Sequence, residues 1–194
     1  MATDLSYIIP LAFASGLNLY ATVAVLGLSS HYGLVALPEQ FRVFDHPLVI
    51  GAALTLYAIE FVADKIPWVD SLWDVVHTAV RPNGSAVVAV AAMGDASPTM
   101  TTIAAVLGGS VAMTTHLAKA GTRAAANTSP EPLSNWILSL GEDVVAIGLS
   151  YGALQHPLVA STIAVALLVA IAAFSLILFR ALRRRRARPK RGIA

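Results

Sequence analysis

The sequence predicts an all-α protein, a polytopic transmembrane helical bundle, and three observations indicate this class. Of the 194 residues, 57% are hydrophobic and only 12% are charged, whereas charged residues make up roughly 25% of a soluble domain. The mean hydropathy of the chain is +0.71. Several apolar runs also reach the ~20 residues that an α-helix needs to cross a bilayer.

The apolar runs form five clear spanning segments and one interrupted segment. Residues 69–81 are amphipathic, and residues 84–94 are apolar but too short to span alone. The Pro and Gly of Arg81-Pro-Asn-Gly-Ser, which joins them, favour a break. Such a helix is tolerated at membrane depth only where protein or a water-filled cavity covers the freed backbone groups. We therefore predict five to six spans, one of them broken or re-entrant; the clear ones are residues 5–29, 47–66, 98–119, 134–154 and 157–181.

The two ends of the chain predict its orientation. No basic residue precedes the first apolar run, so the first helix is not expected to be a cleaved signal peptide. Basic residues accumulate after the last run, and such segments stay on the cytoplasmic side. With this end inside, six crossings place the N-terminus inside and five place it outside. The basic residues, with no acid among them, are Arg180, Arg183, Arg184, Arg185, Arg186, Arg188, Lys190 and Arg191.

This charge distribution predicts two parts: a transmembrane helical domain over residues 1–181 and a disordered, basic cytoplasmic tail over residues 182–194. The expected partners are the lipid bilayer and, at the tail, anionic lipids. No folded nucleic-acid module accompanies the arginines, so nucleic acid is not an expected partner. The expected location is the cell (inner) membrane.

An internal repeat is a further hypothesis, with two competing alignments. At an offset of 92, Gly16 aligns with Gly108, Thr22 with Thr114, and Pro38-Glu39 with Pro130-Glu131. With three crossings in each half, this repeat would be inverted, as in many secondary transporters. At an offset of 110, His46-Pro-Leu-Val aligns with His156-Pro-Leu-Val and implies a different pairing.

Polar residues between positions 60 and 81 form the first candidate site. Charged side chains are costly at membrane depth and persist mainly where they pair, line water or function. After Pro67, two acids, a histidine and an arginine recur at steps of 4, 3 and 4, which places them on one helix face. This spacing suits a structural ladder in which His77 bonds to Asp74, a proton or ion relay, or a divalent-cation site. The members are Glu60, Asp64, Asp70, Asp74, His77 and Arg81.

The second candidate group is a basic stripe. His116, Lys119 and Arg123 follow one another at steps of 3 and 4. Such a stripe can receive a phosphate or carboxylate, or its long side chains can simply extend to the headgroups. Gly108, Gly109 and Ser110, about two turns earlier, allow a neighbouring backbone to approach closely.

The third group consists of polar residues in two apolar runs. Asn18 interrupts the first run, where it either forms an interhelical hydrogen bond or lines a pore. Glu142 and Asp143, which follow Asn135, point about 100° apart on a helix, so at most one faces a given partner. Their own helix offers no cation, so their partners must come from elsewhere.

Acids outnumber bases among the residues expected at membrane depth, by six to four. A surplus buried acid is expected to hold a proton, because burial disfavours the charged form. A proton-coupled carrier would use such an acid. The acids are Glu60, Asp64, Asp70, Asp74, Glu142 and Asp143, and the bases are Lys65, Arg81, Lys119 and Arg123.

Several kinds of chemistry are excluded by the sequence. The chain contains no Cys, which excludes disulfides and thiolate sites. It also lacks hydrolase, zinc-protease and nucleotide-binding motifs. We therefore predict no catalytic residue, no cofactor and no tight metal site, and an enzyme is the less favoured class.

The three groups together resemble a known family, the bacterial DUF4126 membrane proteins. The resemblance covers nearly the whole chain up to the basic tail, and it implies a small polytopic inner-membrane protein. It implies no established activity, so no functional residue is carried over. The segments that carry it are Ser15-Gly-Leu-Asn-Leu-Tyr-Ala-Thr, Glu60-Phe-Val-Ala-Asp-Lys-Ile-Pro-Trp-Val-Asp-Ser-Leu-Trp-Asp-Val-Val-His-Thr, His116-Leu-Ala-Lys-Ala-Gly-Thr-Arg-Ala-Ala-Ala-Asn-Thr-Ser-Pro-Glu-Pro-Leu-Ser-Asn-Trp and Glu142-Asp.

Three functions remain open on these grounds. The leading hypothesis is a small-solute or ion transporter or channel, a homodimer or larger, with a buried polar site. Asp74, His77 and Glu142 would handle protons or cations, while Lys119 and Arg123 would attract an anionic group. The first alternative is a non-transporting membrane scaffold or assembly factor with structural charge pairs. The second is a membrane-embedded enzyme on a lipid phosphate, with Asp70, Asp74 and His77 binding a metal.

Overall fold

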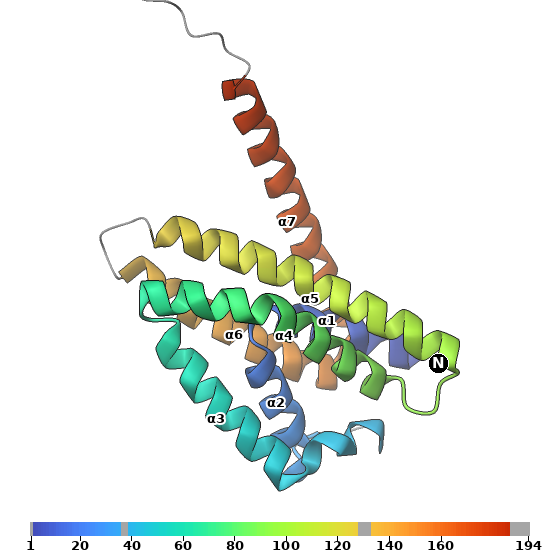
Figure 1. Cartoon of the computed structure of the whole chain (residues 1–194). Helices are drawn as coiled ribbons and strands as arrows, with labels where there is room; N and C mark the ends of the chain where they lie inside the picture. Colours follow the sequence, from blue (N-terminus) through green and yellow to red (C-terminus); the bar gives the residue numbers. More distant parts are fainter. Residues whose placement is uncertain (1, 36–38, 128–132, 187–194) are drawn as a thin grey trace, which may run out of the picture.

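A computed structural model describes residues 2–35, 39–127 and 133–186 (Figure 1). Over these ranges the chain is a bundle of helices without a strand, as the sequence predicts. The helices are α1 (Ala2–Leu17), α2 (Leu19–His31), the short 3-10 helix η1 (Glu39–Asp45), α3 (Pro47–Ala63), α4 (Pro67–Ala92), α5 (Pro98–Ala126), α6 (Leu133–Gln155) and α7 (Pro157–Arg186).

Local sequence explains where several helices begin. Four of them start at a proline, whose missing N–H and fixed φ suit the first helical position. The Nδ1 atom of His46 accepts a hydrogen bond from the Leu48 N–H at the start of α3. The Ser97 hydroxyl oxygen caps α5 in the same way through the Met100 N–H.

The first helix, α1, is the centre of the bundle. It packs against α4, α5, α6 and α7, and in Figure 1 it lies behind α5. Its residues are apolar or small on all sides, as expected of a fully enclosed helix. Ile8, Ala14 and Ser15 are completely buried, and Leu11 and Phe13 nearly so.

The broken helix lies elsewhere than the sequence predicts. Residues 5–29, predicted as one span, form two short helices interrupted at Asn18, whose backbone is extended at φ −150° and ψ 101°. By contrast α4 continues through Pro82, where a break was predicted. The glycines near Pro82 serve packing instead, since a Cβ on Gly84 would lie 2.3 Å from Leu19 Cδ2 and one on Gly109 3.2 Å from the Pro82 carbonyl oxygen.

Membrane-spanning capacity is concentrated in the second half of the chain. Within the described residues, three helical segments are long and apolar enough to cross a membrane: Pro98–Ala126, Asn135–Gln155 and Pro157–Ala181. A fourth span results if η1 and α3, bent by 67° at their junction, count as one. This is fewer than the five to six predicted, because α1, α2 and α3 are each too short to span alone and α4 is not apolar enough along its length.

The last helix extends away from the bundle (Figure 1). It remains helical to Arg186, so the predicted disordered tail does not begin at residue 182. Residues 187–194, which carry the rest of the predicted tail, lie outside the described residues, as do Pro38, Pro130 and Glu131 of the repeat alignment.

Close packing between α1 and α5 makes Gly16 a sensitive position. A Cβ on Gly16 would lie 2.6 Å from the Ala112 carbonyl oxygen and 2.7 Å from Thr115 Cβ. We expect Gly16→Ala to lower the free energy of unfolding by about 1–3 kcal/mol, as overpacking of a tight core does. The measurement is chemical unfolding in mixed detergent micelles.

Gly148→Ala is the matched control, because no atom of the described chain lies within 4 Å of a Cβ built there. Alanine is favoured over glycine in a helix by up to ~1 kcal/mol. The control should therefore be neutral or stabilising. Equal stabilities of the two variants would contradict the close α1–α5 contact.

Candidate functional site

Charged side chains from four helices meet in the core beside the break between α1 and α2. We call these eight residues the charge network. Their cations lie on α4 and α5, and their acids on or beside α3, α4 and α6. All of them except Glu142 are buried, although each has an ionisable side chain. The charge network consists of Arg81, Lys119, Arg123, Glu60, Asp64, Asp70, Asp74 and Glu142.

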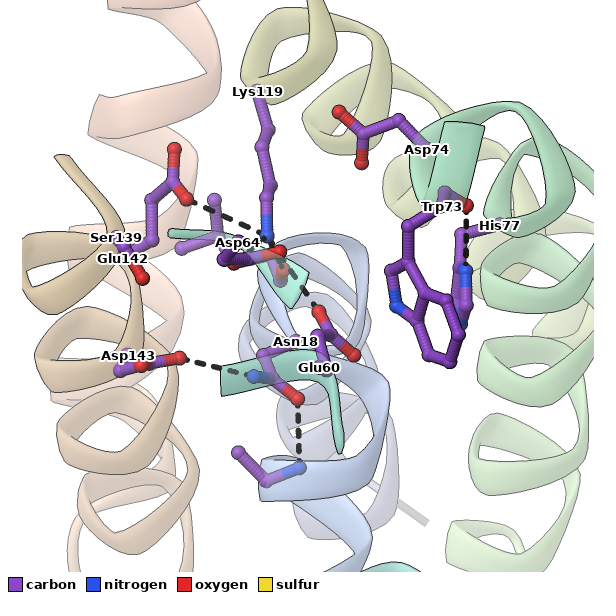
Figure 2. Close-up of polar contacts among 12 residues, drawn as sticks. Asn18, Glu60, Asp64, Trp73, Asp74, His77, Lys119, Ser139, Glu142 and Asp143 are labelled. Carbon is purple, nitrogen blue, oxygen red and sulfur yellow. Dashed lines mark hydrogen bonds and ion pairs between the residues drawn. The ribbon is translucent and has the colours of Figure 1, made fainter. Parts of the chain in front are cut away.

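Lys119 is the centre of the charge network (Figure 2). Its Nζ atom donates to Asp64 Oδ2 at 3.1 Å and lies 3.4 Å from Glu142 Oε2 and 3.6 Å from Glu60 Oε1. It also donates to the Leu17 carbonyl oxygen at 3.1 Å. One ammonium group thus connects three helix-borne carboxylates with the end of α1. The predicted extension of Lys119 to the headgroups is wrong.

Arg81 joins α4 to the same helix end. Its guanidinium lies 2.7 Å from Glu60 Oε1 and 3.7 Å from Asp74 Oδ1. It also donates to the Gly16 carbonyl oxygen at 3.2 Å and to His116 Nδ1 at 2.8 Å. Arg81 thus pairs with an acid on another helix, Glu60 of α3.

The bond from Arg81 defines the state of His116. A guanidinium has only donors, so Nδ1 of His116 must accept, and the ring is neutral. The hydrogen on Nε2 then points to the Asp74 carbonyl oxygen and the Thr78 hydroxyl, each 3.1 Å away. His116 therefore acts as a neutral connector between α4 and α5 and adds no positive charge to the predicted basic stripe.

Arg123 occupies the other end of the charge network. Its guanidinium lies 3.0 Å from Asp70 Oδ1, 3.2 Å from Asp64 Oδ2 and 3.7 Å from Glu142 Oε2. It donates to the carbonyl oxygens of Asn135 and Asp64, both at 2.8 Å. Arg123 is buried, so it holds the starts of α4 and α6 together instead of extending to the surface.

Two asparagines complete this end. The Asn127 amide donates to Asp70 Oδ2 at 3.1 Å, and the Asn135 amide donates to the Asn127 side-chain oxygen. Asn135 is thereby part of the wall around Arg123.

Asn18 compensates for the helix break with both ends of its side chain. Its Oδ1 atom accepts from the Ala21 N–H at 2.9 Å and so caps α2. Its Nδ2 atom donates to Asp143 Oδ1 at 3.0 Å (Figure 2). In a continuous helix the Ala21 N–H would bond to the Leu17 carbonyl. The Ala21 N–H now donates to the Asn18 side chain, and the Leu17 carbonyl oxygen now accepts from Lys119.

Glu142 and Asp143 face different partners, as their 100° separation predicts. Glu142 lies against Lys119 and Arg123, whereas Asp143 accepts from Asn18. The cations beside Glu142 therefore come from another helix, α5, as the lack of a cation in its own helix requires.

His77 does not join the charge network. Its Nδ1 atom donates to the Trp73 carbonyl oxygen at 2.8 Å, and its Nε2 atom lies 3.0 Å from the Tyr20 hydroxyl. The predicted bond from His77 to Asp74 is wrong, because its own helix carbonyl and α2 provide nearer partners. The Trp73 ring stacks on the imidazole at a centroid distance of 4.7 Å.

Lys65, which the sequence analysis included among the bases at membrane depth, also lies outside the charge network. It donates to the Phe61 carbonyl oxygen at 2.7 Å and contacts the Ser139 hydroxyl at 3.4 Å. The sequence analysis did not single out Tyr20, Thr78, Asn127 or Ser139 as site residues. Only Tyr20 had a visible signal, since it follows Asn18 by two residues in an apolar run.

Negative charge is in excess in this core. Among the described residues, the three cations of the charge network face its five acids, and Asp143 lies beside it. Within the same ranges, several buried carboxylate oxygens accept no hydrogen bond of good geometry, although Asp70 Oδ1 lies 3.0 Å from Arg123 and Glu142 Oε2 lies 3.4 Å from Lys119. These are Glu60 Oε2, Asp64 Oδ1, Asp70 Oδ1, Asp74 Oδ1, Glu142 Oε2 and Asp143 Oδ2.

The residues that the enzyme alternative assigned to a metal do not all converge on one point. Asp70 faces Arg123 and Asn127, whereas His77 faces Tyr20. In the described part of the chain, no three His, Cys, Asp or Glu side chains are grouped so that they could hold a metal ion.

One small pocket with both polar and apolar groups in its walls reaches the charge network from outside. It has a volume of about 210 Å³ and lies between α4 and α5, with Ser71, Asp74, Thr78, Ala120 and Arg123 in its walls. Larger hollows are apolar, such as one of about 440 Å³ between α2, α3 and α4. The large cavity expected of an open transporter, lined by Asp74, His77, Lys119 and Glu142, does not occur among the pockets described.

Apolar helices around a buried core of paired charges define the class of this molecule, an α-helical membrane protein. The chain belongs to the DUF4126 family, a domain of unknown function, whose model matches residues 5–176. The match covers all eight residues of the charge network. Comparison with curated proteins and with solved structures finds no match.

Proposed function

We propose that this protein is a proton-coupled membrane transporter of a small solute, and that its charge network carries the coupling proton. The observation that carries the proposal is the excess of buried carboxylates around Lys119 at the break between α1 and α2. The structure supports the proposal through helix geometry and charge, in two steps.

The helix break supports it first. Interrupted helices in transporters place half-helix ends near the bilayer midplane, where they bind ions and substrates. Here the last carbonyls of α1, those of Gly16 and Leu17, bind the cationic groups of Arg81 and Lys119. Lys119 thus holds the position that a free cation takes at such a helix end.

The charge excess supports it second. Carboxylates without a counter-ion are costly inside a bilayer and mark proton relays. A proton on Glu142 would weaken its contact with Lys119 and Arg123, and its loss would restore that contact. Protonation of one acid would therefore change the contacts between α5 and α6, as a coupled carrier requires.

The test is proton flux into proteoliposomes that contain a pH-sensitive dye. We expect flux in the parent protein and a loss of roughly tenfold or more, ~1.4 kcal/mol in barrier height, in Glu142→Gln. Asp74→Asn should also lose flux. Glu39→Gln, whose side chain is 86% exposed outside the charge network, is the matched control and should retain it. Absence of flux for every ion tested in the parent would overturn the proposal.

A membrane scaffold is the second candidate, favoured by one specific observation. All three cations of the charge network are buried and paired with carboxylates, as in a structural core. For a scaffold, Glu142→Gln would alter stability while the parent protein shows no flux.

The remaining expectations stay part of this proposal: a cell (inner) membrane location, a cytoplasmic C-terminus, anionic lipid at the tail and a homo-oligomer. An inverted repeat at offset 92 would pair α3 with α6 and α4 with α7. The competing alignment has a local explanation, because His46-Pro47 and His156-Pro157 both stand where a helix begins.

A further inference from the structure

We propose that the pocket between α4 and α5 is a water-filled proton-uptake port that delivers protons to the Asp74 carboxyl group. This inference rests on the proposed function, since it names the site at which the charge network takes up its proton. Three observations support the port: the pocket itself, the burial of Asp74, and the polar groups around the pocket and around Asp74.

The pocket has room for water, and its wall holds four polar side chains beside the apolar Val75, Ala120 and Ala124. Its volume of about 210 Å³ has room for several water molecules, and its polar wall groups can hydrogen-bond them. The hydroxyl groups come from Ser71 and Thr78 on α4, one turn before and one turn after Asp74. On the opposite wall, the small side chain of Ala120 on α5 leaves space in the pocket.

The Asp74 carboxylate has an oxygen atom that is available to bind a proton. It lines the pocket yet is only 6% exposed. Within the described ranges its Oδ1 atom accepts no hydrogen bond, and the nearest cation, Arg81, is 3.7 Å away. Glu60, by comparison, lies 2.7 Å from the same guanidinium. In Figure 2 Asp74 stands apart from the carboxylates gathered at Lys119.

The surroundings connect this acid with the rest of the charge network. Arg81 contacts both Asp74 and Glu60, and Glu60 contacts Lys119. A proton arriving on Asp74 removes one negative charge beside Arg81, which strengthens the hold of Arg81 on Glu60. The charged or titratable groups that face Asp74 are Asp70 and Arg81 on α4, His116, Lys119 and Arg123 on α5, and Asp64 after α3.

The absence of cysteine from the chain makes thiol labelling a direct test of water in the pocket. Single variants Ser71→Cys, Thr78→Cys and Ala120→Cys place a thiol in its wall. Val76→Cys and Leu117→Cys are matched controls, since they lie two and three residues from Thr78 and Ala120 on the same helices, are 54% and 56% exposed, and do not line the pocket.

We expect a membrane-impermeant thiol reagent to modify the pocket variants at least tenfold faster than the controls in reconstituted full-length protein. Equal rates at pocket and control positions would overturn the port, because the groove would then be filled by lipid or by another protein. This result does not depend on flux, so failure of the port and failure of the transporter are distinguishable.

Infrared spectroscopy tests delivery to Asp74 itself. The parent should show a protonated-carboxyl band that rises on acidification, exchanges rapidly in heavy water and is missing in Asp74→Asn. A bulky label on Thr78→Cys should slow the exchange roughly tenfold, whereas the same label on Val76→Cys should not. A spectrum that Asp74→Asn leaves unchanged, or exchange that the label leaves unchanged, would overturn the proposal, whereas a separate band from protonated Glu142 is expected to remain.

Discussion

Replacement of Lys119 by methionine is expected to lower the free energy of unfolding by about 3–5 kcal/mol, as removal of one partner from a buried ion pair does. The ammonium group contacts Glu60, Asp64 and Glu142 together with the Leu17 carbonyl. Without it, these acids repel one another and a carbonyl at the end of α1 loses its donor. The measurement is chemical unfolding in mixed detergent micelles.

Lys65→Met is the matched control for this prediction. Lys65 donates to one backbone carbonyl and one hydroxyl, so its loss should cost clearly less. Addition of Glu142→Gln to Lys119→Met should recover part of the lost stability, because one unpaired charge is then absent. If Lys119→Met is no less stable than Lys65→Met, Lys119 does not hold the charge network together.

The second large effect concerns the amide–carboxylate pair at the helix break. Asn18→Asp keeps an oxygen to cap α2 but places a carboxylate 3.0 Å from Asp143, where an amide donor now lies. We expect a loss of roughly 3 kcal/mol, because one buried charge remains unpaired beside another. Unfolding in micelles again measures the effect.

The reversed pair is the control. In the double variant Asn18→Asp with Asp143→Asn, the carboxylate lies on α2 and the amide on α6, so the hydrogen bond can form again. Most of the lost stability should return, which appears as a coupling free energy in the double-mutant cycle. Simple addition of the two single effects would show that Asn18 and Asp143 do not interact.

The composition of the candidate site was predictable from residue chemistry, but its pairing was not. Charges in an apolar chain identified every member of the charge network. The opposite orientations of Glu142 and Asp143 also followed, because helix geometry requires them. The partners of His77 did not follow, since Tyr20 and the Trp73 carbonyl compete with Asp74 and only packing decides among them.

The location of the helix break likewise depended on tertiary contacts that the local sequence does not reveal. Proline and glycine near residue 82 favour a break in isolation, yet α4 remains helical there and packs closely on α5 through Gly108 and Gly109. Asn18 resembles an ordinary polar residue in an apolar run. The chain breaks there because Arg81, Lys119 and Asp143, distant in sequence, supply partners for the freed groups.

Composition and periodicity were enough to predict a helical membrane bundle and three groups of polar candidate residues on apolar helices. Hydrophobic content and helical periodicity are local properties, and they need no knowledge of neighbours. The tertiary structure alone decided that these groups form one charge network, that it surrounds a broken helix, and that Asp74 opens to a pocket. Each depends on contacts between residues far apart in the chain, because burial and partner distance set the free energy of a charge.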